Sequence, residues 1–311
     1  MKRISLKWIV PGFVIGVLFC SQPIFSTTYY NDITTVGTSA EMIGIGGVEG
    51  FSHQASVLIE NPAGLGYAGN SLSGFYTTTF ADTQYMAGAV SVKPFQDVVL
   101  GVAVAYQKDS NLDHTDTTSA NEAHLLGTFT MDRLQVVTGV DYCLFKAVHI
   151  GSSWVQYVSN QLEVRGYGMD MAIGVQYHGP FVGVSLSGKN IFGNSIRYND
   201  GTQEKLSTQW GVGFKTMPLS VMDLEVFGEI KTVSHLSAPV KNLGVRFYPL
   251  NDSNFGVSLG YREKTDVVQS KGTMTAGVIL KFHSFSFEYA YDTTDVYQNS
   301  SQHYFSVSGQ Y

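Results

Sequence analysis

Hydrophobic and polar residues alternate along most of the chain from residue 70 onward. In "FSFEYAY" (Phe285 to Tyr291) an aromatic side chain occupies every second position, and small or charged residues lie between them. A β-strand points successive side chains to opposite faces of its sheet, so a period of two predicts strands. "NFGVSLGYR" and "MDLEVFGEI" repeat the pattern, and each predicts a strand with one apolar face and one small or polar face.

Turn signals divide this region into fourteen alternating segments. They cover residues 70–80, 84–93, 97–107, 131–144, 147–160, 167–178, 181–191, 205–217, 220–232, 239–248, 254–263, 272–282, 284–294 and 301–311. Short connections such as "KPFQ" and "HGP" alternate with mostly longer polar ones, including 108–130 and 192–204; residues 122–130 fit a strand as well as a loop. A strand that crosses a bilayer needs about 9–11 residues. An even strand number with short turns at one end is typical of an outer-membrane barrel.

Composition favours this barrel over its rival, a secreted and soluble all-β sandwich or propeller. Only 14% of the residues are charged, whereas a soluble domain carries about 25%. The polar faces of the predicted strands consist largely of Gly, Ser, Ala and Thr, and no run after Phe25 is long enough for a transmembrane helix. We therefore predict an all-β fold, a single transmembrane antiparallel β-barrel of about 14 strands over residues 70–311.

The first 26 residues have the features of a secretory signal peptide. Lys2, Arg3 and Lys7 form a basic region, the apolar run "WIVPGFVIGVLF" follows, and a cut after Ser26 fits. The mature chain then holds 16 basic and 25 acidic residues, a net charge of −9, which argues against nucleic acid as a partner. Export and the barrel pattern together predict the outer membrane of a Gram-negative-type bacterium, with membrane lipid and the barrel assembly machinery as partners.

The chain ends with "HYFSVSGQY", in which Phe305, Val307 and Tyr311 lie on one face of the last predicted strand. A final aromatic residue on an apolar face resembles the terminal-strand signal that the assembly machinery recognises. We expect these three residues to act as the assembly signal.

Residues 27–69 show no hydrophobic period and contain two glycine-rich stretches, "MIGIGG" and "ENPAGLG". Glycine permits close backbone approach and unusual φ/ψ angles, and Asn-Pro favours a turn. A segment of this kind can thread a crowded barrel interior, and the alternative is an ordinary loop that leads into the first strand. The residues of the two stretches that define the motif are Gly44, Gly46, Gly47, Asn61, Pro62, Ala63 and Gly64.

The stretch from Gly37 to Gly66 resembles the N-terminal signature of FadL-like outer-membrane proteins, and most closely that of their shorter PorV/PorQ branch. "MIGIGGVEG" and "NPAGLG" fill both halves of that signature. Downstream, "GKNIFG" resembles an Asn-Leu-Gly motif with Ile191 and Phe192 in place of Leu, and "EKLSTQWGVGF" resembles the next strand with Ser207 in place of Pro. The resemblance covers most of the mature chain. It implies that residues 27–69 form a hatch inside the barrel.

Nine charged residues share the polar faces of the predicted strands and should point into the lumen. They are Asp141, Asp170, Asp223, Glu225, Glu229, Arg246, Arg262, Lys281 and Glu288. Paired with each other or bonded to the hatch, these charges would anchor it; the alternative is a selectivity device.

No pattern of catalytic or metal-binding residues stands out. The histidines include no pair that suggests a shared site, no Gly-x-Ser-x-Gly elbow occurs, and "DHTD" lies in the longest polar connection. Cys143 is the one cysteine of the mature chain, and no ligand cluster has the spacing of a zinc site. We expect no enzyme activity, no catalytic residue, no metal and no cofactor.

Two classes of function follow from the resemblance. The first is a plugged channel that transports hydrophobic or amphipathic small molecules, with such a molecule as its ligand. The alternative is a secretion-system or surface-assembly accessory of the PorV/PorQ type, with a secreted protein as partner. Loops of 23 residues or fewer differ from the large capture loops of fatty-acid transporters, so the sequence leaves the ligand open.

Overall fold

The computed structural model describes residues 28–79, 83–117, 123–216, 223–249, 254–265, 270–293 and 301–311. The predicted signal peptide lies outside these residues. Within them, no helix is both long enough and apolar enough to cross a membrane.

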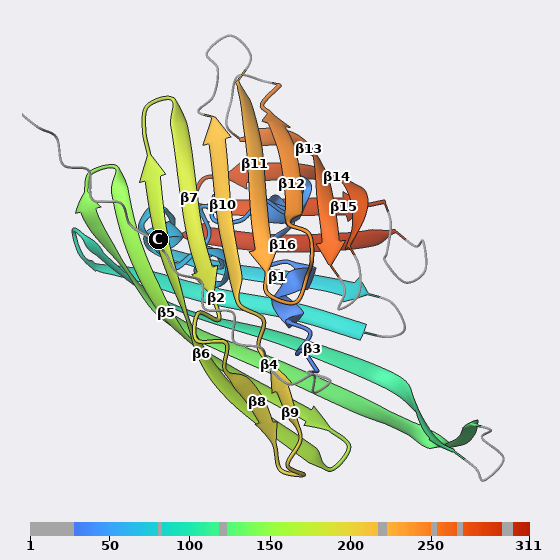
Figure 1. Cartoon of the computed structure of the whole chain (residues 1–311). Helices are drawn as coiled ribbons and strands as arrows, with labels where there is room; N and C mark the ends of the chain where they lie inside the picture. Colours follow the sequence, from blue (N-terminus) through green and yellow to red (C-terminus); the bar gives the residue numbers. More distant parts are fainter. Residues whose placement is uncertain are drawn as a thin grey trace, which may run out of the picture.

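Fourteen antiparallel strands close into a barrel, as the sequence predicts (Figure 1). They are β1 (Ser71–Thr79), β2 (Thr83–Phe95), β3 (Val98–Thr117), β4 (Ala123–Phe145), β5 (Val148–Gln161), β6 (Val164–His178), β7 (Val182–Lys189), β10 (Gln209–Thr216), β11 (Leu224–Val233), β12 (Val240–Phe247), β13 (Phe255–Thr265), β14 (Ser270–Phe282), β15 (Phe285–Asp292) and β16 (Gln302–Gln310). The last strand pairs with the first, and β7 pairs with both β6 and β10. Each strand therefore has two neighbours, which satisfies the edges of the sheet.

Two connections differ from the prediction. Residues 108–130 are not a loop, because β3 and β4 continue through most of this range as a paired ribbon. Residues 192–204 contain a second hairpin, formed by β8 (Ser195–Tyr198) and β9 (Gln203–Lys205). Both hairpins carry polar residues on both faces. The hydrophobic period that reveals a half-buried strand is therefore missing there.

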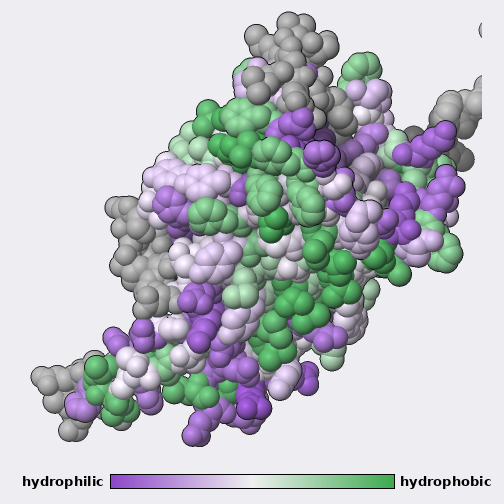
Figure 2. All heavy atoms as spheres, turned by 180° about the vertical axis from the view of Figure 1, so that it is seen from behind, coloured by the Kyte–Doolittle hydropathy of each residue, from purple (hydrophilic) through white to green (hydrophobic). Residues whose placement is uncertain are grey.

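Side chains alternate between the lumen and the outside along the wall. In β12 every second residue is buried, and the residues between them, including Leu243 and Phe247, are exposed. Exposed Val, Leu, Phe, Tyr and Trp side chains recur on the outward faces of the strands, and Figure 2 shows apolar patches on one side of the molecule. An outward apolar surface of this extent is typical of a barrel that lies in a membrane.

The inner wall has two chemically different sides. Phe75, Tyr85, Val137 and alanines of β2 and β3 form the apolar side, which covers β1 to β5. Charged residues of β10 to β15 form the other side. The lumen is thus mainly apolar along one wall, where Asp109, Arg133, Asp141 and His149 are exceptions, and charged along the opposite wall.

The N-terminal segment, residues 28–69, lies inside the barrel (Figure 1) and is called the hatch segment below. It consists of the short helices η1 (Ile33–Val36), α1 (Ala40–Gly44), α2 (Val57–Glu60), η2 (Pro62–Gly64) and α3 (Leu65–Ala68). Helix α1 contacts β13 to β16, whereas η2 contacts β4 to β6. The segment therefore bridges opposite walls of the lumen.

The two rims of the barrel differ. The short-turn rim holds the tight turns after β2, β4 and β14 and also the C-terminus. The long-loop rim holds the β3–β4 connection and the β8–β9 hairpin. The hatch segment starts at the long-loop rim, where Lys205 of β9 donates its backbone N–H to the Thr28 carbonyl at 2.9 Å. It ends at the short-turn rim, where Gly69 leads into β1.

This path predicts the side on which the N-terminal end lies. An epitope placed just before Thr28 should be accessible from the same side as an epitope at Gly201, in the β8–β9 turn, because the Lys205 backbone donates to the Thr28 carbonyl and accepts from the Tyr30 N–H. An epitope at His283, in a tight turn, should be accessible from the opposite side. Antibody binding to proteoliposomes of defined orientation measures this. Recognition of the N-terminal epitope together with the His283 epitope would contradict the path.

Candidate functional site

Asn61 holds the hatch segment to the wall. Its side chain is fully buried, and its Nδ2 donates to Ser185 Oγ at 2.8 Å and to the Leu186 carbonyl at 3.1 Å. Its Oδ1 accepts from the backbone N–H of Ala63 at 3.0 Å and so caps η2. One amide side chain thus fixes both the local turn and its position against β7.

The Asn-Pro-Ala turn fits against glycines of β5 and β6. A Cβ built on Gly151 would lie 2.4 Å from the backbone nitrogen of Ala63, and one built on Gly174 would lie 1.7 Å from Asn61 Oδ1. Neither position has room for a larger residue. The two wall glycines therefore allow backbone contact between η2 and the barrel.

The glycine turn after α1 makes a second close contact, on the opposite wall. Gly46 has a φ of +79°, a conformation that favours glycine. A Cβ on Gly244 of β12 would lie 2.2 Å from the Ile45 carbonyl oxygen, and one on Gly260 of β13 would lie 2.2 Å from the Gly46 nitrogen. Asn242 reinforces this contact, because its Nδ2 donates to the Gly47 carbonyl at 3.0 Å.

Two ion-pair clusters fix the hatch segment to the charged wall. In the first, Glu41 Oε1 lies 2.9 Å from the Arg246 guanidinium, which also lies 3.5 Å from Glu225. Lys215 Nζ lies 3.8 Å from the other oxygen of Glu225. Burial raises the pKa of Glu41, but the charges of Arg246, His53 and Lys281 and a hydrogen bond from Ser52 together outweigh it, so the net pKa lies below its ordinary value. Glu41 is therefore the anionic partner of a buried cluster.

In the second cluster one carboxylate of the hatch segment binds two wall lysines. The Glu49 oxygens lie 2.7 Å from Lys189 Nζ and 2.7 Å from Lys231 Nζ, and Glu229 lies 3.7 Å from Lys231. Burial opposes ionisation of Glu49, but the two ammonium groups outweigh it and lower its pKa to about 2. Glu49 thus links β7 to β11 through the hatch segment.

The structure brings six of the nine predicted lumen charges to the hatch segment, and five of these lie on β11 to β15. Glu229 joins the Glu49 cluster, and Arg262 donates to the Val36 carbonyl at 3.2 Å and to the Thr35 carbonyl. Glu288 accepts from the backbone N–H of Glu41 at 3.2 Å and from the Gln54 amide. The other two, Glu225 and Arg246, belong to the Glu41 cluster.

The sixth is Asp141, which is bonded to His149 and accepts from the backbone N–H of Gly66 in the hatch segment. The remaining three lie elsewhere. Asp170 accepts backbone N–H bonds from Phe192 and Asn194 at the long-loop rim. Lys281 is half-buried at the short-turn rim. Asp223 differs from the prediction, because it lies in the turn before β11 with a φ of +43° and is not part of a strand. Asp tolerates this left-handed conformation better than most residues.

Sequence reasoning missed several inward charges. Arg133 and Asp109 form an ion pair of 2.7 Å, and Lys189, Lys215 and Lys231 all bind carboxylates. Each lies in the same alternating register as the glycines or polar residues of its strand. The alternating register could therefore have predicted that these charged side chains point into the lumen.

Two histidines that the sequence does not bring together lie beside the same tyrosine. The ring of Tyr67, in α3, stacks on His178 with a centroid distance of 3.8 Å, and it lies 4.6 Å from the His149 ring. His149 Nδ1 lies 2.8 Å from Asp141 Oδ1. These residues come from three strands and the hatch segment, so their separation in sequence hid the cluster.

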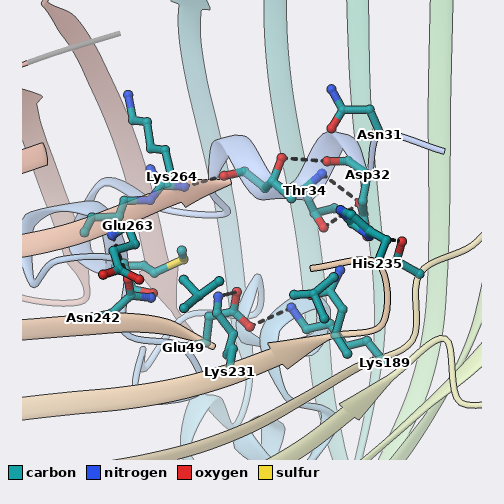
Figure 3. Close-up of a pocket in the computed structure, with 18 of the residues that line it drawn as sticks. Asn31, Asp32, Thr34, Glu49, Lys189, Lys231, His235, Asn242, Glu263 and Lys264 are labelled. Atoms are coloured by element: carbon teal, nitrogen blue, oxygen red, sulfur yellow. Dashed lines mark hydrogen bonds and ion pairs between the residues drawn. The ribbon is translucent and has the colours of Figure 1, made fainter. Parts of the chain in front are cut away.

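Two polar cavities lie at the two rims of the lumen, on opposite sides of the hatch segment. The first, of about 60 Å³, is at the long-loop rim, and Figure 3 shows Glu49 between Lys189 and Lys231 in its wall, with Asn242 nearby. The second, of about 160 Å³, is at the short-turn rim and is lined by Glu41, among other residues. The remaining polar residues of this second cavity are His53, Gln54, Lys281, His283, Ser284, Ser286, Glu288, Ser308 and Gln310. The hatch segment separates the two cavities.

Glu60 is a buried carboxyl group of the hatch segment. Its Oε2 accepts from the Gly50 N–H at 2.7 Å, and its Oε1 accepts from the Thr38 hydroxyl. Burial raises the pKa of Glu60 to about 7, although these two hydrogen bonds and Lys189 oppose the shift and Glu49 adds to it. The protonated form therefore fits this position better than the carboxylate does.

This raised pKa predicts that the seated hatch segment weakens as pH rises. A carboxyl group whose pKa is raised contributes stability below its ordinary pKa, near 4.5, and loses it as pH rises through about 7. Single-channel conductance should therefore increase several-fold between pH 5 and pH 8. Glu60→Gln keeps an acceptor and a donor but does not titrate, and should flatten the dependence. An unchanged pH profile in this variant would assign the dependence to another group.

Two of the predicted assembly residues, Phe305 and Val307, lie on the outer face of β16, and Tyr311 follows the end of that strand. Phe305, Val307 and Tyr311 are exposed, and the Tyr311 backbone N–H donates to the Asn70 carbonyl at 3.2 Å. Their role in assembly stays a prediction. Among the residues that the structure describes, no group of three or more His, Cys, Asp or Glu side chains is placed to hold a metal ion.

Known proteins share this architecture. The chain is similar to the P. putida toluene transporter TodX, with a TM-score of 0.62 and 12% identity over 88% of this chain and 99% of that one. It is also similar to the Ralstonia pickettii toluene transporter TbuX (0.58, 11%, 88% and 98%) and to a Pseudomonas aeruginosa FadL homologue (0.56, 9%, 88% and 98%). No protein-family model and no curated protein sequence matches the chain. At these identities the likeness establishes a shared fold.

Proposed function

We propose that this protein is a FadL-like channel of a Gram-negative outer membrane that transports hydrophobic or amphipathic small molecules past an internal hatch. The observation that carries the proposal is the hatch segment, held between two cavities in a lumen that is mainly apolar on one wall and charged on the other. An amphipathic molecule can place its apolar part against the first wall and its polar group against the second.

The contacts of the hatch segment suit a closed but movable plug. On the apolar side, Leu58 and Leu65 pack against residues of the wall without any ion pair. On the charged side, the two clusters around Glu41 and Glu49 hold the segment by polar contacts. Polar contacts of this kind can be exchanged for contacts with water or with a ligand's polar group. Transport would then require the hatch segment to shift within the lumen.

The three similar solved structures also support the proposal, independently of the geometry of this protein. Two of them are described as toluene transporters, and the third is described as a FadL homologue. All three share the barrel over 88% of this chain. Their ligands are properties of those proteins. The two-sided lumen is the reason to extend the substrate class here to amphipathic molecules.

Uptake into cells tests the proposal. A Gram-negative host that lacks its own channel of this class would express the protein, and the uptake of radiolabelled toluene, oleate and sucrose would be measured. Uptake of toluene, oleate or both should accelerate relative to cells without the protein, whereas sucrose uptake should not. Uptake rates equal to those of control cells for both hydrophobic probes would overturn the proposal.

The sequence resemblance to the PorV/PorQ branch supports an alternative, a surface-assembly accessory that binds exported proteins. Mass spectrometry of the gently purified protein separates the two functions. Bound lipid-like molecules would support transport. Copurification of an exported protein, together with unaccelerated uptake, would support the accessory function.

A further inference from the structure

The outward face of β6 carries an apolar run whose length fits one crossing of a bilayer. The run extends from residue 167 to residue 177, and its exposed side chains are Tyr167, Met169, Ile173, Val175 and Tyr177. A strand that crosses a bilayer needs about 9–11 residues, and aromatic residues flank the apolar band of such barrels. Arg165 occupies the next outward position, towards the long-loop rim, and is exposed. The membrane surface on this side therefore lies near Tyr167.

A hollow opens on the outer face at this level, where the β8–β9 hairpin lies beside β6 (Figure 1). Strand β6 pairs with β7 from His178 to Ile173 and with β8 at Gly166 and Tyr167. Between these pairings no described strand adjoins β6 on that side, and residues 190–194 pass there instead. The hollow measures about 450 Å³, and its lining includes Tyr167, Met169, Asn194, Ser195 and Arg197.

Hydrogen bonds fix the loop that forms one side of the hollow. The buried Asp170 carboxylate accepts from the backbone N–H of Phe192 at 3.1 Å and from that of Asn194 at 2.9 Å. Asn194 Nδ2 in turn donates to the Met169 carbonyl at 2.8 Å. Gly193, between Phe192 and Asn194, has a φ of +58°, a conformation that favours glycine. The hollow is therefore a preformed feature of the fold.

Three exposed basic side chains lie around the hollow on the same face. Arg197 of β8 is paired with Tyr167 of β6, and Lys205 of β9 is paired with Ser195 of β8. Paired residues, and residues two apart in one strand, share a face of a sheet. Arg165, Arg197 and Lys205 therefore project outward together with Tyr167. Within the part of the chain that the structure describes, none of these three side chains forms an ion pair.

The acidic residues of this region do not neutralise these cations. Glu163 lies in the β5–β6 turn and Asp200 in the β8–β9 turn, each farther from the apolar run than the arginine of its own hairpin strand. Asp200 accepts from the Thr202 hydroxyl at 2.7 Å. Asp132 lies two strands away on β4 and accepts from the Tyr106 hydroxyl at 2.5 Å. The charge beside the hollow is therefore positive, and it favours an anionic ligand.

We propose that this hollow binds the phosphorylated head group of a membrane lipid. Guanidinium groups form charge-assisted, often bidentate hydrogen bonds with phosphate, and Arg165 and Arg197 have no carboxylate partner among the described residues. The acyl chains of the same molecule would lie along Met169 and the rest of the apolar run, and the Tyr167 ring would pack against the head group. A lipid supplies an anion and an apolar part at the level where the two surfaces meet. The site is independent of the transport role, because it lies outside the lumen.

Native mass spectrometry of the protein in a neutral detergent tests the proposal, with dioleoyl phosphatidic acid as the probe. We expect Arg165→Gln/Arg197→Gln to bind this lipid about tenfold more weakly than the wild type does, which corresponds to about 1.4 kcal/mol. Lys108→Gln/Lys241→Gln removes two other outward cations near the long-loop rim, so it is the matched control and should bind as the wild type does. Ser195→Tyr keeps every charge but fills the hollow, and it should also weaken binding.

Dioleoylglycerol, which lacks the phosphate, is the control lipid and should bind more weakly than phosphatidic acid. The mobility shift on heating in a denaturing gel verifies that each variant forms the barrel. Equal binding of phosphatidic acid to the wild type and to either the arginine variant or Ser195→Tyr would overturn the proposal, as would an equal loss in the lysine variant. Displacement of the lipid by inorganic phosphate at the same concentration would also overturn it, because the hollow would then be a site for free phosphate.

Discussion

Removal of residues 37–66 is expected to convert the protein into an open pore. The deleted residues include α1, α2 and η2, which contact opposite walls of the lumen. The hydrogen-bond ladder of the fourteen strands is complete without them, so the barrel should still close. Single-channel conductance in planar bilayers should rise on the order of tenfold, because barrels of 16–18 strands leave an aqueous channel and one of 14 is only slightly narrower.

Substitution of two residues of the hatch segment should give a smaller rise in conductance than the deletion does. Asn61→Ala with Pro62→Ala removes the bonds to Ser185 and Leu186 and a backbone constraint, each worth on the order of 1 kcal/mol. That loss is too small to open the barrel wall but enough to populate an unseated hatch segment. We expect brief openings in this variant. Asn199→Ala, at the long-loop rim and away from the hatch segment, is the control and should behave as the wild type.

Equal insertion must be verified for every variant by the heat-dependent mobility shift. If the deletion, the double variant and the wild type then carry the same current, the hatch segment does not obstruct conduction. The plug role would have to be abandoned in that case.

The barrel could be predicted from sequence because its signal is local. Each wall strand alternates apolar and small or polar residues, and burial alternates in the same register, as in β12. The Asn61 turn could also be predicted, because Asn-Pro restricts the backbone locally. The extension of β3 past residue 108 could not, since a strand exposed on both faces has no hydrophobic period; on the β4 side the sequence left residues 122–130 open between strand and loop.

Most of the contacts that hold the hatch segment in the lumen join residues that are far apart in sequence. Gly151, Gly174, Gly244 and Gly260 are four of 33 glycines, and although the strand register places them on the inward face, nothing local distinguishes them from inward glycines such as Gly183 that contact wall residues instead. His149 and His178 likewise come together only in the folded chain, where both rings contact Tyr67, so the sequence could not place them near each other. Inward lysines such as Lys215 could have been predicted, because the strand register places them on the lumen face. Their carboxylate partners could not.

Substitution of the wall glycines of β12 and β13 is the second change for which we expect a large effect on conductance. Gly244→Ala and Gly260→Ala should unseat the hatch segment while the barrel stays closed. The new Cβ atoms would lie 2.2 Å from the Ile45 carbonyl oxygen and 2.2 Å from the Gly46 nitrogen, so the hatch backbone or the wall must move. Overpacking of a close contact costs about 1–3 kcal/mol. With both substitutions present, the glycine turn should leave β12 and β13.

The matched control is the same substitution where the structure has room. Gly74 and Gly88 lie on outward positions of β1 and β2, and Cβ atoms there would come no closer than 3.7 Å to a neighbouring side chain and 3.8 Å to a neighbouring backbone oxygen. Gly74→Ala/Gly88→Ala should therefore match the wild type in conductance and in heat-dependent mobility. Gly244→Ala/Gly260→Ala should keep the mobility shift but raise the conductance and the protease sensitivity of the hatch segment. If both pairs conduct as the wild type does, the glycine turn is not what seats the hatch segment, and the ion pairs of Glu41 and Glu49 would have to hold it alone.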